Sequence, residues 1–540
     1  MKTNLSYILL YCSLVSLAIS CANPVSPTGG PKDTVPPMVS QYNPPTEKTL
    51  FTESEFSITF DEYVKLDNVF KQVVISPPFE EQPEFIVKGK SLKVTFLEEL
   101  KPNTTYTINF GQAVKDITEG NVVKNLTYVF STGEFLDSLS LGGKVVNAQT
   151  NKAESGCLVL LYEEFSDSVV VKRKPNYFAR TDEGGSFSIN NLKRGPFKMV
   201  ALNDINFNLQ YDLPEELIGF MSESIVLTDS MAKVRLKVFK NEPAKLRLLN
   251  HSAKRPGHIH LVFNQFLEEC SITSMDGNNV SHLNYNESRD TVSAWLSNLY
   301  VQSASLLVKV DGSIHDTIKV NFRMSTPDST KRNTLRMISA RNAGLRLLSD
   351  SKNLDVLFNR PIAEIKENRI QVWLDSSKNE NNLLLEVNQE KSNQVKLNSE
   401  FSAGETYKMV FLPKAIFDIY GHYNDSIEIG FKVLKNNELG NIKLTFSEGE
   451  DSAKYHVQIQ SAKGQIIGRR SFHPGKNREL VFQNMIPGKY KIVVLVDENE
   501  NGRWDTGNYF SNQQPERKIF YSKDVDLRAN WEFEAEMSLD

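Results

Sequence analysis

Apolar and polar residues alternate along most of the chain with the period of two that half-buried β-strands show. The segments "EFSITF", "KSLKVTF" and "TTYTINF" are examples. Turn-forming stretches such as "LKPNTT" and "KDITEGN" separate them. No long segment has the 3.6-residue apolar period of an amphipathic helix. The pattern therefore predicts an all-β chain of β-sandwiches in series.

Two segments repeat the same order of features, which indicates a duplicated domain of a first type, A. Each has a strand that ends in Phe and a polar residue, then a Thr-Tyr strand, an Asp-Ile turn and a closing strand with Phe. These positions are Phe60, Thr105, Asp116 and Phe130 in the first copy, and Phe358, Thr406, Asp418 and Phe431 in the second. A weaker copy, A′, lies between Pro243 and Arg323.

A second type of repeat, B, is interleaved with the first. The segment "GPFKMVALNDINFNLQYD" matches "GKYKIVVLVDENENGRWD" without a gap. Asp204 corresponds to Asp497 in this match, and Asp212 corresponds to Asp505. The chain therefore has the order A-B-A′-A-B.

The length of 540 residues is too great for one hydrophobic core and indicates several domains. Residues 22–45 are rich in Pro, Gly, Ser and Thr, which is typical of an extended tether. The predicted organisation is a signal peptide (1–20), a flexible tether (21–45) and five sandwiches (46–133, 138–236, 240–325, 333–434 and 438–540).

The residues of these repeats resemble known families. Through "LKPNTTYT" and "YVFSTG", the A units resemble the bacterial Ig-like domain of surface-layer proteins (SbsA type). Through "RTDEGGSFSINNLKRGPF" and "IPGKYKI", the B units resemble carboxypeptidase-regulatory-like or Cna-B-type domains. Those domains are transthyretin-like sandwiches. The whole arrangement, with "GGPKDTVPP" near its start, is similar to a group of Bacteroidetes lipoproteins.

The first 21 residues have the layout of a secretory signal, with Lys2, a largely apolar run and the small Ser20. Cys21 stands where a bacterial lipobox, which this segment resembles, would be cleaved and lipidated. The alternative is an ordinary secretory peptide with an incidental cysteine. Lipidation predicts attachment to the outer membrane, where a periplasm-facing position is favoured because no acidic cluster follows Cys21. Surface exposure remains the alternative.

Composition narrows the classes of function. The net charge is only −4, so nothing favours a nucleic-acid partner. Cys157 and Cys270 lie in apolar settings and far apart, so each is expected to be a buried, inert thiol. The sequence contains no GxSxG, HExxH or Walker motif. A non-enzymatic protein without a required cofactor is therefore predicted.

The stretch "DENENGRWD" spaces oxygen-bearing residues as a calcium-binding loop does, around Gly502. Its candidate ligands are Asp497, Asn499, Asn501, the backbone carbonyl of Arg503, and Asp505. The corresponding loop of the first B unit offers Asp204, Asn206, Asn208, Asp212 and Glu215, but has Leu209 where glycine belongs. The alternative for both is a polar turn that bonds its own backbone. His258 and His260 share one side of a strand, and are expected to face solvent without a third metal ligand.

Tripeptides of Asp, then Ser or Thr, then an apolar residue or Thr recur along the chain. They resemble the O-glycan acceptor motif of Bacteroidetes exported proteins, and the alternative is a common turn-to-strand junction. The candidate acceptors are Thr34, Ser138, Ser168, Thr291, Thr317, Ser426 and Ser452.

These observations predict a lipid-anchored envelope protein whose row of sandwiches acts as a scaffold or in adhesion. Its partners would be the membrane, through the lipid, and an envelope protein. The alternative function is a carbohydrate-binding accessory lipoprotein of the outer membrane. Exposed aromatic residues in a planar row would favour that alternative, and buried ones would count against it.

Overall fold

The structure is a computed structural model of the chain. It describes residues 33–540 except 244, 323–333, 342–345, 349–353, 375–376, 380–383, 390, 399–400, 448, 450–452, 474–477 and 540. Strands make up most of the described secondary structure, which confirms the predicted all-β fold of tandem sandwiches. No described helix is long and apolar enough to span a bilayer.

The sandwiches are numbered as modules 1–5 in chain order. Module 1 has one sheet in the order β1-β2-β6-β5 and a second in the order β4-β7-β9, with the pair β3-β8 beside them. Its elements are β1 (Val39–Asn43), β2 (Glu55–Phe60), β3 (Val64–Leu66), α2 (Val69–Gln72), β4 (Val74–Ser76), β5 (Glu84–Lys88), β6 (Ser91–Thr95), β7 (Thr105–Asn109), β8 (Val114–Asp116) and β9 (Thr127–Ser131). Aromatic rings fill the space between the sheets, and those of Phe56 and Tyr128 stack with centroids 3.8 Å apart.

Module 4 repeats this topology, as the A repeat predicts. One sheet has the order β25-β27-β32-β31, the other β26-β35-β33-β29-β30, and β28 pairs with β34. Its elements are β25 (Met337–Arg341), β26 (Arg346–Leu348), β27 (Leu354–Phe358), β28 (Ile362–Ile365), η2 (Glu367–Arg369), β29 (Ile370–Leu374), β30 (Ser377–Asn379), β31 (Leu384–Val387), β32 (Gln394–Asn398), β33 (Thr406–Phe411), β34 (Ile416–Asp418) and β35 (Ile427–Val433).

The Asp-Ile turns of the A repeat are built around a buried carboxylate. Backbone N–H groups of residues 119–121 donate to Asp116 at 2.7–2.9 Å. Burial alone would raise the pKa of Asp116, but these donors outweigh burial and lower it. In module 4, Asp418 accepts two backbone N–H groups of its turn and a bond of 2.9 Å from Arg360. The conserved order of features thus reflects a shared turn geometry within the chain.

Modules 2 and 5 share the topology of the B repeat. In each, the first strand runs parallel to the last strand, as β10 does with β17 and β36 with β43. Module 2 contains β10 (Leu139–Asn147), β11 (Leu158–Tyr162), α3 (Val169–Lys172), β12 (Tyr177–Arg180), β13 (Ser186–Leu192), β14 (Gly195–Leu202), β15 (Leu217–Phe220), β16 (Ile225–Leu227) and β17 (Met231–Lys240). Module 5 contains η3 (Asn436–Glu438), β36 (Gly440–Ser447), β37 (Lys454–Ser461), β38 (Ile466–Phe472), β39 (Glu479–Met485), β40 (Gly488–Asp497), β41 (Lys518–Phe520), β42 (Val525–Leu527) and β43 (Glu532–Ser538).

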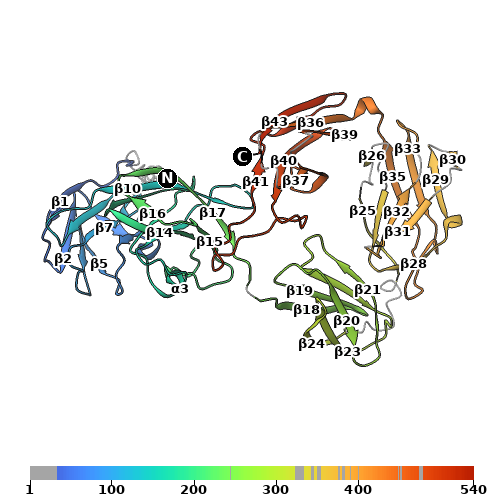
Figure 1. Cartoon of the computed structure of the whole chain (residues 1–540), viewed down its shortest axis with the longest axis horizontal. Coiled ribbons are helices and arrows are strands. Elements are labelled where there is room, and N and C mark those ends of the chain that lie inside the picture. The colour runs from blue at the N-terminus through green and yellow to red at the C-terminus, as the bar shows by residue number, and fades with distance from the viewer. Residues whose placement is uncertain are drawn as a thin grey trace, which may run out of the picture.

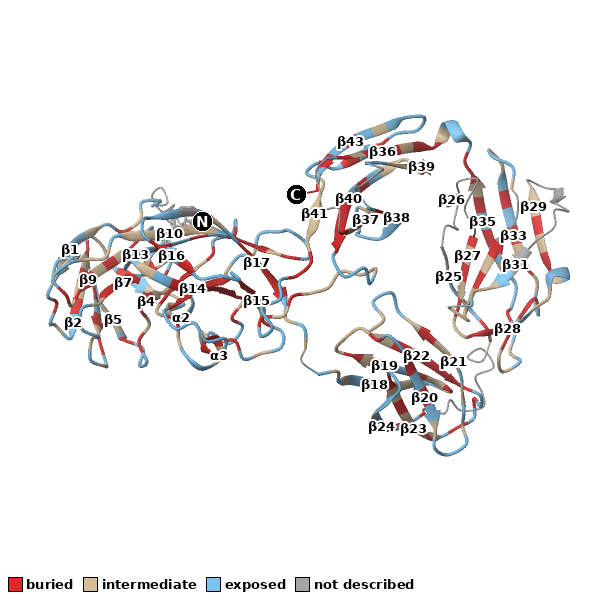
Figure 2. Ribbon diagram, in the orientation of Figure 1, coloured by how far each residue is buried: buried red, intermediate tan, exposed pale blue. Residues whose placement is uncertain are grey.

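Module 3 is a smaller sandwich with sheets β18-β19-β22-β21 and β20-β23-β24. Its strands are β18 (Leu248–Arg255), β19 (His258–Phe263), β20 (Cys270–Ser274), β21 (Val280–Tyr285), β22 (Thr291–Leu296), β23 (Ser303–Val310) and β24 (Ser313–Asn321). Buried and partly exposed residues alternate without interruption along β23 (Figure 2). This alternation is the pattern from which the sandwich was predicted.

Both cysteines within the described residues are buried free thiols, as predicted. Cys157 belongs to the core of module 2 and Cys270 to that of module 3. Burial raises the pKa of Cys157 to about 12 and that of Cys270 to about 11, so both stay protonated at neutral pH.

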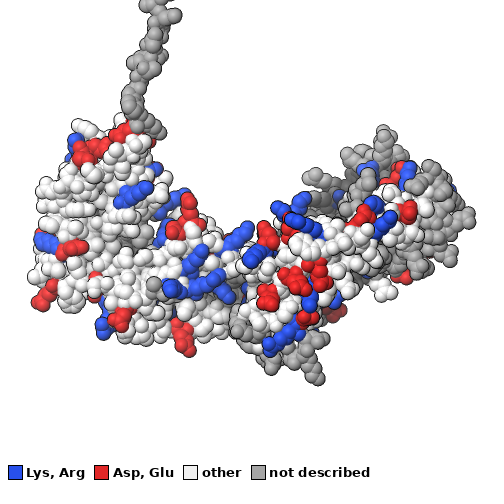
Figure 3. Space-filling view, turned by 90° about the horizontal axis from the view of Figure 1, so that it is seen from above, with Lys and Arg blue, Asp and Glu red and all other residues white. Residues whose placement is uncertain are grey.

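The modules follow a curved path in which the last module returns to the second (Figure 1). Modules 1 and 2 lie side by side, and the backbone N–H of Phe178 donates to Ser76 Oγ across their boundary at 2.9 Å. Acidic and basic side chains are intermingled on the face that Figure 3 shows. This mixture agrees with the small net charge of −4 and with the absence of a large single-sign field on that face.

Candidate functional sites

The first candidate site is the Asp/Asn loop that follows β40. Asp497 is the last residue of β40, and its side chain has no exposed surface. Its carboxylate accepts hydrogen bonds from the backbone N–H of Gly502 at 2.8 Å and of Asn501 at 3.1 Å. Its Oδ2 also lies 2.7 Å from Nε2 of His456, a residue of the adjacent strand β37. Asp497 therefore fastens the loop to the sheet.

The remaining candidate ligands of this loop bond to one another. The side-chain amides of Asn499 and Asn501 both donate to Asp505 Oδ2 at 2.6 Å. Arg503 Nε lies 3.0 Å from the other oxygen of Asp505. The Arg503 guanidinium also lies over the ring of Phe266 in module 3, 4.1 Å from its centroid. The loop thus contacts module 3 through the side chain of Arg503, a residue that was expected to contribute only its backbone carbonyl as a metal ligand.

The loop after β14 in module 2 has the same construction. Asp204 accepts the backbone N–H of Leu209 at 2.9 Å. The side-chain amides of Asn206 and Asn208 donate to the carboxylate of Asp212 at 3.1 and 2.8 Å. The structure therefore brings together both predicted sets of Asp and Asn residues, one in each B module.

The two loops also share their backbone conformation. Phe207 and Glu500, which correspond in the repeat, have φ of 62° and 59°. Leu209 and Gly502, which also correspond, have φ of 61° and 78°. Leu209 therefore adopts the left-handed conformation for which glycine was expected, at a cost of about 1 kcal/mol for a non-glycine residue.

In the module 2 loop, the carboxylate that closes the loop is next to the predicted candidate. Glu215 is exposed, whereas its neighbour Glu216 is fully buried and accepts the N–H groups of Ile205 and Asp212 at 3.0 and 3.2 Å. In module 5 the equivalent place is taken by Glu516. Glu516 belongs to the chain beyond an insertion that the repeat does not predict.

Glu516 accepts the N–H groups of Glu498 and Asp505 at 3.0 and 2.9 Å. The pKa of Glu516 is raised to about 7. Burial is the largest cause, the two N–H donors oppose the rise, and the charges of Asp505 and Asp497 add to it. The carboxyl therefore lies among negative groups in a site that a cation would favour electrostatically.

As the structure stands, the loops satisfy their own hydrogen bonds. A cation would require the Asn499 and Asn501 side chains to turn their carbonyl oxygens, in place of their amide nitrogens, toward Asp505. Within the described parts of the chain, no three His, Cys, Asp or Glu side chains are placed to hold a metal together. Calcium binding by these loops stays a prediction.

The insertion between Asp505 and Glu516 is a docking element that the sequence analysis missed. It forms a tight turn in which Asn508 and Gln513 pair, and it lies against module 2. The backbone N–H of Tyr509 donates to Asn241 Oδ1 at 2.7 Å. The side-chain amide of Gln514 donates to the carbonyl oxygen of Phe220 at 3.0 Å.

Tyr509 is the centre of this contact between modules 2 and 5. It is 2% exposed and belongs to the same buried cluster as Phe220 and Phe239 of module 2. Its ring meets that of Phe220 edge-on, at 86° with centroids 5.3 Å apart. At Gly507, an added Cβ would lie 2.6 Å from Cζ of Phe239. The contact is therefore packed to the density of a core.

A second contact joins modules 3 and 4. The side-chain amide of Asn284 donates to Asn393 Oδ1 at 2.9 Å, and Asn284 Oδ1 accepts the N–H of Ser392 at 3.2 Å. Nearby, the Tyr420 hydroxyl donates to the carbonyl oxygen of Leu296 at 2.7 Å. This arrangement fixes the ends of the two sandwiches to one another.

The predicted histidine pair lies beside that contact, with ring centroids 5.3 Å apart. His260 is exposed, as expected. The expectation was wrong for His258, whose ring stacks on Trp295 at 4.7 Å and 16°. The pKa of His258 is lowered to about 4, mainly by burial and in addition by the charges of His260 and Arg255.

The remaining predicted residues are not gathered at one site. Cys21 and Ser452 lie outside the described residues. Of the other glycan-acceptor candidates, four are exposed and two, Ser168 and Thr291, are partly buried; the exposed ones are Thr34, Ser138, Thr317 and Ser426. The Thr291 hydroxyl donates to the neighbouring Asp290 at 2.7 Å. These positions stay predictions.

Comparison with known proteins supports the fold of the first module. The bacterial Ig-like domain family matches residues 33–132. Among solved structures, the S-layer protein rSbsC(31-844) matches with 12% sequence identity and a TM-score of 0.16. The match spans 91% of this chain and 67% of the S-layer chain. BcpA, the major pilin subunit of Bacillus cereus, matches with 11% sequence identity and a TM-score of 0.14. The match spans 74% of this chain and 98% of the BcpA chain. No curated protein matches. The sheets described above make the chain a multi-domain β-sandwich protein, and its residues 33–132 match a bacterial Ig-like domain.

Proposed function

We propose that the protein is a non-enzymatic, lipid-anchored envelope protein in which modules 1–5 act as a scaffold for a protein partner. Cys21 carries the lipid, and the tether that follows it is shorter than the predicted 21–45, because residues 39–43 form strand β1 of module 1 and pair with β2. The anchor lies in the outer membrane and the modules face the periplasm. The proposal treats modules 2–5 as one framework that presents fixed edges and loops.

The observation that carries the scaffold role is the core-like contact between module 5 and module 2. Flexible tandem domains have small polar contacts, and their relative motion is the default. Here Tyr509 of module 5 is 2% exposed in a cluster with rings of module 2. A chain with such a contact holds several sandwich surfaces at fixed positions, which is useful for binding large partners and unnecessary for a plain spacer.

The test is capture of the native protein from gently cross-linked envelopes, with identification of bound proteins by mass spectrometry. The matched control is Cys21→Ala, which removes the lipid and leaves the modules unchanged. A partner recovered with the native protein and lost with Cys21→Ala supports an anchored scaffold. A Gly507→Ala variant separates the two parts of the proposal, because it perturbs the module 2–5 contact and retains the anchor.

Two results would contradict the proposal. Recovery of the Cys21→Ala protein in the membrane fraction in the same amount as the native protein would remove the anchor. Recovery of polysaccharide without any protein partner would favour the alternative carbohydrate-binding function. The intact mass of protein from its native envelope, compared with protein made in the cytoplasm, tests the seven glycan-acceptor candidates separately.

A further inference from the structure

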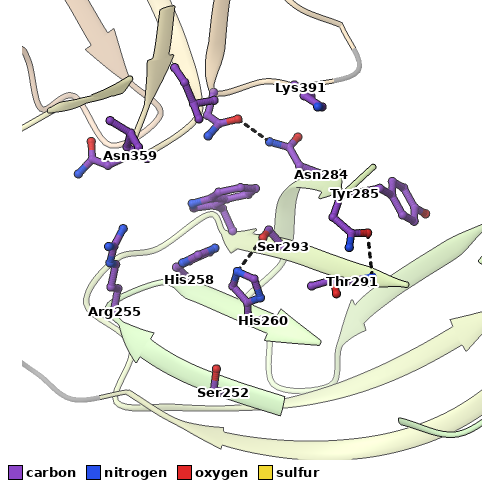
Figure 4. A pocket seen from close by; sticks show the side chains of 15 residues that line it. Ser252, Arg255, His258, His260, Asn284, Tyr285, Thr291, Ser293, Asn359 and Lys391 are labelled. Atoms are coloured by element: carbon purple, nitrogen blue, oxygen red, sulfur yellow. Dashed lines mark hydrogen bonds between the residues drawn. The ribbon is translucent and has the colours of Figure 1, made fainter. Parts of the chain in front are cut away.

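A cavity of about 590 Å³ lies between modules 3 and 4, beside the Asn284–Asn393 contact (Figure 4). Its floor is the sheet β18-β19-β22-β21 of module 3, from which His258, His260 and Trp295 project. Leu357 and Asn359 line it from module 4. A concave space of this size between two domains is a typical location for a small-ligand site.

Two polar atoms are buried at this cavity without a hydrogen-bond partner. They are Nε1 of Trp295 and Nε2 of His258. Trp295 is only 4% exposed, so its indole N–H is an unsatisfied donor in an almost fully buried side chain. Buried donors in native proteins are nearly always paired. A ligand with acceptor oxygens would satisfy both atoms, since His258 Nε2 can donate when it carries the proton.

The charged side chains that line the cavity are cationic, and the nearby carboxylate of Asp290 is bonded to the lining residues Asn286 and Thr291. Arg255 of module 3 and Lys391 of module 4 both line it, and no Asp or Glu is among its described lining residues. Neither cation forms an ion pair with a described acidic residue. The guanidinium of an arginine matches a carboxylate with two parallel hydrogen bonds. The cavity is therefore suited to an anion, and Arg255 favours a planar one.

The rest of the lining consists of hydroxyl and amide groups with a small apolar part. Ser252 and Thr291 contribute hydroxyl groups. Asn359 uses its Oδ1 to accept the backbone N–H of Arg336, and its Nδ2 has no described partner. Ile338 and Leu357 supply the apolar part. Several neutral donors and acceptors with a limited apolar surface match a ring that carries many hydroxyl groups.

We propose that this cavity binds a saccharide that contains a uronate. Arg255 and Lys391 lie at opposite ends of the cavity (Figure 4). The carboxylate of one uronate unit therefore bonds to Arg255 and that of another unit to Lys391, while hydroxyl groups of the saccharide bond to Trp295 Nε1, Asn359 and the hydroxyl side chains. The proposal goes beyond the scaffold function and does not depend on the lipid anchor. A saccharide bound there would contact both modules and strengthen the boundary between them.

The test uses the chain from residue 22 onward and isothermal titration calorimetry with defined hexasaccharides. The acidic probes are oligomers of galacturonate, glucuronate, mannuronate and guluronate. The matched neutral probe is the methyl-esterified galacturonate oligomer, and inorganic phosphate is the probe for a simple anion. We expect at least one acidic oligomer to bind, and the neutral probe to bind at least about tenfold more weakly.

Variants assign the binding to this cavity. Arg255→Gln and Lys391→Gln are each expected to weaken binding by about tenfold or more, and Trp295→Phe by several-fold, because it keeps a ring and removes the N–H. Lys319→Gln is the matched control, because Lys319 is an exposed cation of the same module on the other sheet, in β24. It should leave binding unchanged.

Three results would overturn the proposal. One is equal binding of the acidic oligomers and the esterified oligomer, and another is failure of all four acidic oligomers to bind. The third is phosphate binding that matches the best oligomer in affinity, which would identify a simple anion site. A variant that loses binding is compared with wild type by circular dichroism, so that unfolding is not taken for loss of a contact.

Discussion

At the scale of single residues, His258 gives the protein a defined dependence on pH. Its pKa is lowered to about 4, first by burial and then by the charges of His260 and Arg255. Lys391 faces the same cavity from module 4. Between pH 6.5 and 4 the unfolded chain binds more protons at this residue than the folded chain does, so folding stability falls as the pH falls.

We therefore expect the free energy of unfolding of module 3 to decrease by on the order of 3 kcal/mol between pH 7 and 4 because of His258. Urea denaturation of the whole chain at several pH values measures this change, followed by fluorescence of Trp295 in a background where Trp373, Trp504 and Trp531 are replaced by Phe. The His258→Gln variant removes the titrating group and should flatten the curve in this range. An equal pH dependence in the wild type and the variant would assign the effect to other groups.

The candidate calcium loops give a second prediction at this scale. Addition of Ca²⁺ is expected to raise the unfolding temperature of module 5, with weak affinity of about 10⁻⁴–10⁻³ M, because the loop lacks the bidentate carboxylate of a high-affinity site. Asp505→Ala should abolish the shift. Asp526→Ala, an exposed acidic residue of β42, is the matched control and should preserve it. A shift absent in the wild type would contradict the prediction.

At the scale of elements, alternation and internal repeats predicted most of what the structure contains. The shared β10–β17 and β36–β43 pairings follow from the B repeat, because equivalent apolar faces must be buried in equivalent sheets. The carboxylate that bonds to the loop backbone is Glu216, next to the predicted candidate ligand Glu215. The calcium template counts positions along the chain, whereas the turn into β15 decides that Glu216 points inward.

The docking turn between residues 506 and 515 could not be predicted in the same way. Its polar residues are typical of an ordinary loop, and the gap-free match to module 2 ends at Asp505. The surface that gives the turn its role is formed by Phe220 and Phe239, more than 250 residues earlier. A match between two distant surfaces leaves no periodic pattern in the sequence.

Gly507 is the residue through which this element can be tested. A Cβ there would lie 2.6 Å from the ring of Phe239 and 2.7 Å from the carbonyl oxygen of Gln513. Gly507→Ala is therefore expected to weaken the module 2–5 contact by about 1–3 kcal/mol through overpacking. Small-angle X-ray scattering should then show a larger radius of gyration, with an unchanged circular dichroism spectrum.

The control for this variant is Gly430→Ala in β35, where an added Cβ meets no atom within 4 Å. It should leave the scattering curve unchanged. A Gly507→Ala protein as compact as the wild type would show that the docking turn does not hold modules 2 and 5 together in solution.

At the scale of the whole molecule, modules 2–5 form a closed path. The chain itself links each of these modules to the next, Asn284 lies in an additional contact between modules 3 and 4, and Tyr509 lies in the contact that returns module 5 to module 2. The contact of Arg503 with Phe266 adds a link between modules 5 and 3. In a closed path each contact keeps the partners of the others at a high effective concentration.

The consequence is coupling between contacts that do not touch. Asn284→Ala opens the boundary of modules 3 and 4, and Gly507→Ala opens that of modules 2 and 5. Once either contact is lost, the effective concentration of the two surfaces that form the other contact falls, and that contact becomes weaker. In a double-mutant cycle read by small-angle scattering, the double variant should therefore expand by less than the sum of the two single variants. Additive expansions would mean that the two contacts are independent. The modules would then be flexibly linked domains without a fixed arrangement.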